Sequence, residues 1–218
     1  FRKIGENWPG IIYQEKSKKY YFNLPWIQRW LKYGRRVGVH HVDRIVSLCC
    51  VHAGSIETDY QFFMERIPEI ILKTGAKTVV CAGDIKEGTE HDLGKKGEIV
   101  PGMDNNTIQE KVAHNMFGGV FFKVFKVWFL EFLKPGYKER LVEERLGAAI
   151  KECLVDFEYW FGNHDLWETK HGHEPLEIFH LGLVTFLTQQ IAEFLESKGL
   201  QYPRLNELVT NKIRRHNF

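Results

Sequence analysis

The sequence predicts an α/β fold. From residue 44 onward, short apolar and β-branched runs alternate with longer segments whose apolar residues recur at helical spacing. Three of the short runs end in a polar cluster that contains glycine, which is typical of the carboxyl ends of strands in open α/β sheets. The chain has 218 residues, 44% of them hydrophobic and 27% charged, which excludes a wholly disordered chain and suits one substantial domain with a short extension.

Three short segments are expected to form strands, because each is an apolar or β-branched run with a glycine-containing turn soon after it. These strands are 44–51, 77–82 and 154–161. Four longer segments have apolar residues at helical spacing and are expected to form helices. These helices are 58–73, 107–133, 137–153 and 176–199. Pro68 is expected to kink or divide the first helix, and residues 200–218 carry no clear signal.

Charge divides the chain into a basic arm and a mildly acidic body. The net charge is +2, yet residues 1–36 contain nine Lys or Arg and two Glu, so this segment carries +7. Nine aromatic residues are interleaved with this charge. Residues 1–40 are expected to form a basic, aromatic arm beside a domain formed by residues 41–218. An amphipathic helix over 25–33 that packs onto this domain is favoured, because dense aromatic residues usually belong to a core. The alternative is a site for nucleic acid, since such a segment can hold phosphates and stack bases.

The cysteines and the hydropathy pattern indicate a chain that works in a reducing, cytoplasmic environment. Cys49, Cys50 and Cys81 lie in apolar runs that are expected to be buried strands, where thiols stay reduced. The amino end is polar and does not resemble a signal peptide. The most apolar stretch, 116–133, contains three charged residues, which argues against a membrane span. A buried helix is favoured there, with a membrane-surface or partner-binding helix as the alternative.

The polar clusters after the three strands carry the residues expected to do chemistry. They are Cys50-Val51-His52-Ala53-Gly54, Gly83-Asp84-Ile85-Lys86-Glu87-Gly88 and Gly162-Asn163-His164-Asp165. Because the carboxyl ends of parallel strands lie at one edge of a sheet, these side chains are expected to converge. His, Asp and Asn form a ligand set for Mn, Fe or Zn. Two such ions about 3.5–4 Å apart can bind a phosphoryl group and activate water.

These clusters, in this order, resemble the motifs of the calcineurin-like metallophosphoesterase family. Gly162-Asn163-His164-Asp165 matches the third motif in full, Gly83-Asp84 matches the second, and His52 matches the last residue of the first. The resemblance covers residues 44 to about 170. It implies a four-layer α/β/β/α sandwich that hydrolyses a phosphodiester or a phosphomonoester.

Carried over to this sequence, the resemblance implies a dinuclear site for two divalent ions, Mn, Zn or Fe. His52 would bind the first ion, Asp84 would bridge both ions, and Asn163 would bind the second. His164 would stabilise or protonate the leaving oxygen, so Asp84 and His164 are the expected catalytic residues. The basic arm favours a nucleic acid or a nucleotide as the phosphate ester substrate.

Two departures from the family pattern keep a second hypothesis open. Cys50 stands where the first motif has Asp; its thiolate would bind Zn or Fe, whereas a buried thiol would weaken that metal position. The family's carboxyl-terminal Gly-His-x-His motif is not found after His164, so the sandwich is expected to be incomplete at the carboxyl end. The alternative function is therefore that of a binding or assembly module on a catalytically degraded phosphoesterase fold.

Two further regions are expected to border the site. His91, in the loop after the second motif, and Asp165, at the end of the third, are candidates for contacts with substrate. Glu87 is a candidate for lining the cleft or for supporting a metal ligand. For Glu87 and His91, a solvated loop is the favoured interpretation. The segment 105–153 is longer than a β-α-β connection needs, and it is expected to form a helical insertion that caps the site or provides a homodimer face.

Overall fold

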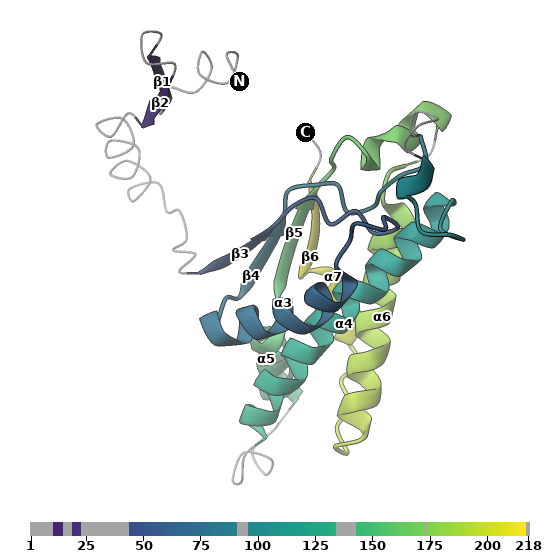
Figure 1. The fold of residues 1–218 in the computed structure, drawn as a ribbon. Coiled ribbons are helices and arrows are strands. Elements are labelled where there is room, and N and C mark those ends of the chain that lie inside the picture. The colour runs from purple at the N-terminus through teal and green to yellow at the C-terminus, as the bar shows by residue number, and fades with distance from the viewer. Residues whose placement is uncertain are drawn as a thin grey trace. The chain divides into compact units, whose positions relative to one another are not determined.

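The computed structural model describes residues 11–14, 19–22, 44–90, 96–133, 143–172 and 174–216 (Figure 1). The chain divides into two compact units, Phe1–Val42 and Asp43–Phe218. In the first unit, β1 (Ile11–Gln14) and β2 (Lys19–Phe22) form an antiparallel pair. The helix expected over 25–33 lies outside the described residues.

The second unit is built on a four-stranded parallel sheet, which confirms the predicted α/β fold class. The strands follow one another in chain order across the sheet. They are β3 (Ile45–Leu48), β4 (Thr78–Cys81), β5 (Asp156–Trp160) and β6 (Ile213–His216). The register places Val46, Val79, Phe157 and Ile213 in one row across the sheet, and all four side chains are buried.

Helices fill each connection between neighbouring strands, as parallel pairing requires. The helices are α3 (Tyr60–Thr74), then α4 (Asn106–Phe132) and α5 (Glu143–Cys153), then α6 (Glu177–Glu196) and α7 (Leu205–Thr210). α4 packs against both α3 and α6 (Figure 1). The segment 105–153 therefore connects β4 to β5, and its first helix lies in the core.

A cluster of aromatic rings joins the helices to the sheet. The ring of Phe117 on α4 lies 4.9 Å from that of Phe63 on α3, 5.1 Å from that of Phe157 on β5 and 5.5 Å from that of Phe179 on α6. All four rings are almost fully buried. Edge-to-face and tilted contacts at these distances stabilise a core beyond the area that they bury. One helix layer thus packs onto the sheet face that carries Phe157.

The opposite face of the sheet is partly exposed and charged. Ile45 at its edge is 52% exposed. Lys212 Nζ lies 2.7 Å from a carboxylate oxygen of Asp156, and Arg214 lies 2.9 Å from Glu158. Parallel sheets are usually covered by apolar packing on both faces, so this face differs from the usual pattern.

Most predicted elements are confirmed, with ends that differ by a few residues. α3 runs without a break through Pro68, which is buried, so the proline does not divide this helix. The loop after the second motif contains a short 3-10 helix, Lys96–Glu98. α7 and β6 carry no clear sequence signal, because β6 reads Ile-Arg-Arg-His and is mostly polar. Arg214 of β6 belongs to the partly exposed face, where it pairs with Glu158.

Among the described helices, α6 alone is long and apolar enough to cross a membrane. Length and composition are the basis of that finding. Six of its side chains are buried, Phe179, Leu183, Val184, Leu187, Ile191 and Leu195, and the helix packs against α4 and α7. These contacts bury part of the helix inside the second unit.

Candidate metal centre

The loops that follow β3 and β4 continue side by side beyond the ends of the strands. Cys50 N donates to Gly83 O at 3.2 Å, His52 N donates to Asp84 O at 2.9 Å, and Glu87 N donates to Ala53 O at 3.0 Å. This pairing extends the parallel register past the sheet. It brings residues of the first and second motifs together, as the sequence predicts.

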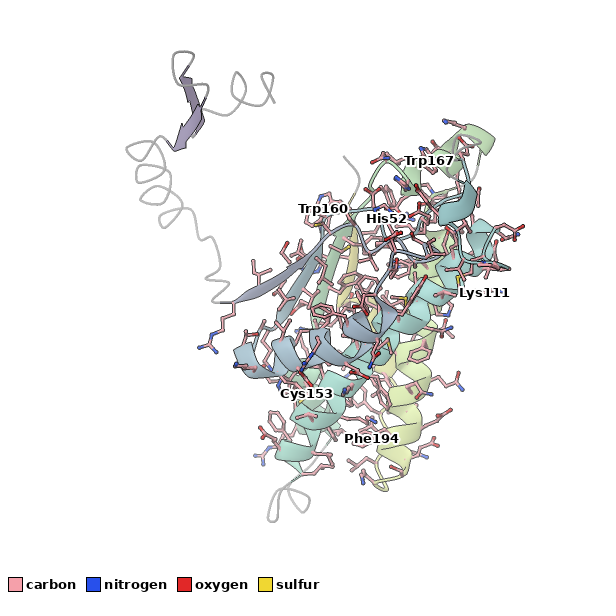
Figure 2. All side chains as sticks on the ribbon, in the orientation of Figure 1. His52, Lys111, Cys153, Trp160, Trp167 and Phe194 are labelled. Carbon is pink, nitrogen blue, oxygen red and sulfur yellow. The ribbon has the colours of Figure 1, made fainter. Side chains whose placement is uncertain are left out.

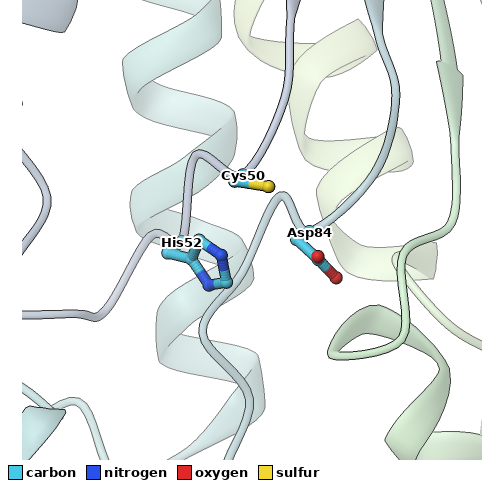
Figure 3. A group of neighbouring side chains, drawn as sticks. All are labelled: Cys50, His52 and Asp84. Atoms are coloured by element: carbon cyan, nitrogen blue, oxygen red, sulfur yellow. The ribbon is translucent and has the colours of Figure 1, made fainter. Parts of the chain in front are cut away.

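Cys50, His52 and Asp84 converge at this edge of the sheet (Figure 3). Their candidate ligand atoms, a sulfur, a ring nitrogen and a carboxylate oxygen, all lie within 4.8 Å of one another. Cys50 is exposed, and the other two are partly buried. A set of one soft and two harder donors suits Zn or Fe better than Mg.

The same three residues share a strained backbone. Their φ angles are 52°, 51° and 52°, in the left-handed region that residues other than glycine rarely adopt. Among the described residues, Leu176 is the only other non-glycine residue with a positive φ. Each such conformation costs on the order of 1 kcal/mol or more, and such residues cluster at functional sites. The strain therefore marks the residues that the sequence identifies as candidate ligands.

Two glycines allow the ends of β4 and β5 to approach each other closely. A Cβ atom on Gly83 would lie 2.5 Å from Gly162 N, and one on Gly162 would collide with the carboxylate of Asp84. In the absence of such atoms, His164 N reaches Asp84 Oδ1 and donates to it at 3.0 Å. The glycines of the second and third motifs thus hold Asp84 in place through packing.

Asp165 joins the loop after β4 to the loop after β5 through hydrogen bonds in the core. We expected its side chain to contact substrate, but it is fully buried and accepts hydrogen bonds from Gly162 N, Ile85 N and Lys86 N at 2.9–3.1 Å. Burial raises the pKa of Asp165 to about 6, against the opposing effect of these backbone donors. Its position gives it a structural part in the site.

A second group forms where Glu87 turns back towards His52. Oε2 of Glu87 lies 2.8 Å from Nδ1 of His52, and the side chain of Glu87 is 5% exposed. The rings of His52 and His164 meet edge to face with their centroids 4.7 Å apart. Candidate ligand atoms of these three residues also lie within 4.8 Å of one another.

The ring of His164 is held from two sides. Its Nδ1 lies 2.5 Å from the carbonyl oxygen of Glu87, and Trp167 stacks on it at 4.2 Å. Asn163, the preceding residue and the expected ligand of the second ion, is exposed. His91 lies outside the described residues. Figure 2 places His52 and Trp167 towards one end of the second unit, with Cys153 and Phe194 towards the other.

A pocket of about 560 Å³ opens beside this site. Cys50, His52, Glu87 and His164 line it, while Asp84 does not. The remaining lining combines apolar side chains, such as Phe62 of α3, with acidic ones and, among the described residues, contains no Lys or Arg. The acidic lining residues beyond Glu87 are Glu57, Asp59 and Glu98.

The exposure of Cys49 and Cys50 differs from the sequence prediction. Both are exposed rather than buried in a strand, because β3 ends at Leu48 and the chain turns at Cys50; Cys81 is buried as expected. Desolvation, together with the neighbouring thiol of Cys49, raises the pKa of Cys50. A raised pKa keeps this sulfur protonated unless a cation displaces the proton.

A buried lysine lies behind the loop after β4. Lys86 is fully buried, forms an ion pair with Glu168 and lies 3.5 Å from Glu110 Oε1. The other carboxylate oxygen of Glu110 accepts a hydrogen bond from Phe179 N in α6 at 2.8 Å. Burial raises the pKa of Glu110 to about 7. This network ties the loop to α4 and α6, and nothing in the sequence pattern singles it out.

Comparisons of the chain with protein-family models, with curated proteins and with solved structures found no match.

Proposed function

We propose that the chain is a metal-dependent phosphoesterase whose ion is held by Cys50, His52 and Asp84 at the carboxyl edge of the parallel sheet. The observation that carries this proposal is the convergence of three candidate ligands that all have a left-handed backbone. A folded chain retains strain of this kind where the surrounding structure and function require it. The order of the motifs along the chain favours phosphate ester hydrolysis over other metal-assisted reactions.

The ligand set fits an ion of the Zn or Fe type. When bound there, such an ion would polarise a phosphoryl oxygen and lower the pKa of a water molecule. The protein's own contribution is to fix the ligands. The carboxylate of Asp84 is oriented by His164 N, and His164 is oriented by the carbonyl of Glu87 and by Trp167. His164 lines the pocket, where it would stabilise or protonate a leaving oxygen.

The substrate class that we propose depends on the composition of residues 1–40. Their basic charge favours a nucleic acid or a nucleotide, whereas the carboxylates that line the pocket do not attract a polyanion. We therefore propose a phosphodiester or phosphomonoester of which one phosphate enters the pocket. The four free cysteines support a reducing compartment such as the cytoplasm.

We also propose the four-layer α/β/β/α sandwich as the complete architecture. The described residues of the second unit provide one sheet with helices on the Phe157 face. The partly exposed face that carries Asp156 and Glu158 is where a second sheet would pack.

A hydrolysis assay tests the proposal. Metal-free protein is reconstituted with Zn²⁺, Fe²⁺ or Mn²⁺ and supplied with bis(p-nitrophenyl) phosphate and p-nitrophenyl phosphate. We expect turnover only with metal, and its loss in Asp84→Asn. Glu69→Gln is the control, because Glu69 is exposed on α3 and pairs with Arg66. Turnover that is equal in Asp84→Asn and Glu69→Gln, or absent with every ion, would overturn the proposal.

A second candidate function is that of a binding module with a degraded site. The specific observation in its favour is Cys50, an exposed thiol with a raised pKa at the position of a ligand. Cys50→Asp separates the two functions. A large gain of phosphatase activity in this variant would show that the natural site is impaired, whereas a loss would show that the thiolate takes part.

A further inference from the structure

We infer that His52, Glu87 and His164 form a second cation-binding position, which takes a borderline divalent ion such as Zn²⁺ or Fe²⁺. It differs in its ligands from the position formed by Cys50, His52 and Asp84, and the two share His52. The inference rests on the proposed function for its role in hydrolysis. The binding itself is independent of any substrate.

The contact between His52 and Glu87 is the first argument. Nδ1 of His52 lies 2.8 Å from Oε2 of Glu87, yet this buried nitrogen has no hydrogen-bond partner among the described residues. A nitrogen and a carboxylate oxygen at this separation, without hydrogen-bond geometry, are arranged as two ligands of one ion are. A cation bound to both atoms would give the His52 nitrogen a partner.

The tautomer of His164 is the second argument. A carbonyl oxygen only accepts hydrogen bonds, so the 2.5 Å contact with Glu87 O requires Nδ1 of His164 to carry a proton. The neutral ring therefore has its lone pair on Nε2, and an ion bound there would make His164 a ligand in place of a proton donor to the leaving oxygen. Histidines that bind metals usually donate their other ring N–H to a carbonyl or a carboxylate, which fixes the ring. Trp167 stacks on this ring at 4.2 Å and restricts its rotation further.

The ligand set and its location define the kind of site. Two histidines and one glutamate leave an open position on zinc, as catalytic zinc sites do. His52, Glu87 and His164 all line the pocket of about 560 Å³, so that open position would be accessible from the pocket. The set contains no sulfur, in contrast to the position that includes Cys50.

That contrast in sulfur content makes the two positions distinguishable with Co²⁺ as the probe. Cobalt bound to a thiolate shows a charge-transfer absorption band that cobalt bound to histidine and glutamate lacks. The full chain, freed of metal, is titrated with Co²⁺ and compared with Cys50→Ser, Glu87→Gln and the control Glu98→Gln. Glu98 lines the same pocket but belongs to neither group.

We expect Cys50→Ser to lose the charge-transfer band and still bind Co²⁺. We expect Glu87→Gln to keep the band while its sulfur-free cobalt site weakens by about 10-fold or more, and Glu98→Gln to match the natural chain. Binding by Glu87→Gln that equals binding by Glu98→Gln would overturn the inference. So would the loss of all bound Co²⁺ in Cys50→Ser.

A second variant keeps the test valid if Glu87→Gln does not fold. His164→Gln changes a partly exposed residue of the same group, and it should weaken the sulfur-free site by a similar factor. Failure of this inference and failure of the proposed function remain separable. Cobalt binding that depends on Glu87 in a chain without hydrolytic activity contradicts the proposed function alone, and the reverse result contradicts this inference alone.

Discussion

Replacing Gly162 by alanine should destabilise the protein and displace Asp84. The added Cβ would collide with the carboxylate of Asp84, and it would also lie 2.3 Å or less from main-chain and side-chain atoms of that residue. Asp84 cannot retreat easily, because its Oδ1 accepts a hydrogen bond from His164 N and its carbonyl oxygen accepts one from His52 N. Overpacking of this kind costs about 1–3 kcal/mol of unfolding free energy.

Gly97 provides a matched control for this substitution. Neither glycine has a positive φ, and a Cβ on Gly97 would meet no atom within 4 Å. Gly97→Ala should therefore change the unfolding free energy by about 0.5 kcal/mol or less. The comparison isolates the collision from the general effect of replacing glycine by alanine on the unfolded chain.

Urea unfolding followed by tryptophan fluorescence measures both variants, and Co²⁺ titration reports on the site. We expect Gly162→Ala to unfold at a lower urea concentration than Gly97→Ala and to bind Co²⁺ more weakly. Equal unfolding free energies for the two variants would refute the reasoning that close packing against Gly162 holds Asp84.

Three further predictions concern the buried and capping residues. The folded chain should hold a proton on Asp165 that the unfolded chain releases, so stability should fall by on the order of 2–3 kcal/mol as the pH rises from about 4 to 6. Urea unfolding across this range should show the fall in unfolding free energy in the natural chain and a flatter pH profile in Asp165→Asn. Equal slopes in the two chains would contradict this prediction. Lys86→Met should cost about 3–5 kcal/mol, because it leaves buried carboxylates without their cation, and adding Glu110→Gln should recover part of that loss in thermal unfolding. No recovery would argue against a charge effect. Asp59→Ala should cost about 1 kcal/mol by the same assay, since Asp59 caps α3 through Phe62 N at 2.8 Å, and an unchanged midpoint would count against the cap.

The convergence of His52 and Asp84 could be predicted from the sequence, because it depends only on strand order. Each residue follows a strand closely, and neighbouring parallel strands end at the same edge of the sheet. The sequence did not show that the close neighbour of Gly162 is Asp84.

The parts of the site formed by loop pairing could not be predicted in this way. Glu87 reaches His52 because the loops stay paired beyond the strands, through the bridge between Ala53 and Lys86. The burial of Asp165 and the ion pairs of Lys86 depend on the same pairing and on the packing of α4 and α6. Residue type alone favours exposure for all three residues, so their burial became clear only from the tertiary structure.

The charged strand β6 illustrates a similar limit. Its residues Arg214 and His216 interrupt the apolar pattern that predicts a strand. They lie near Glu158 of β5, with contacts of 2.9 and 3.3 Å, on the partly exposed face. Pairing across strands therefore stabilises a segment that its own composition does not identify.

Anomalous X-ray diffraction at the zinc edge, from crystals of the chain supplied with Zn²⁺, tests whether this edge of the sheet binds a metal ion through Cys50, His52 and Asp84. We expect an anomalous peak about 2.0–2.3 Å from a ring nitrogen of His52, an oxygen of Asp84 and the sulfur of Cys50. Zinc peaks elsewhere on the molecule, with none beside His52 and Asp84, would contradict it.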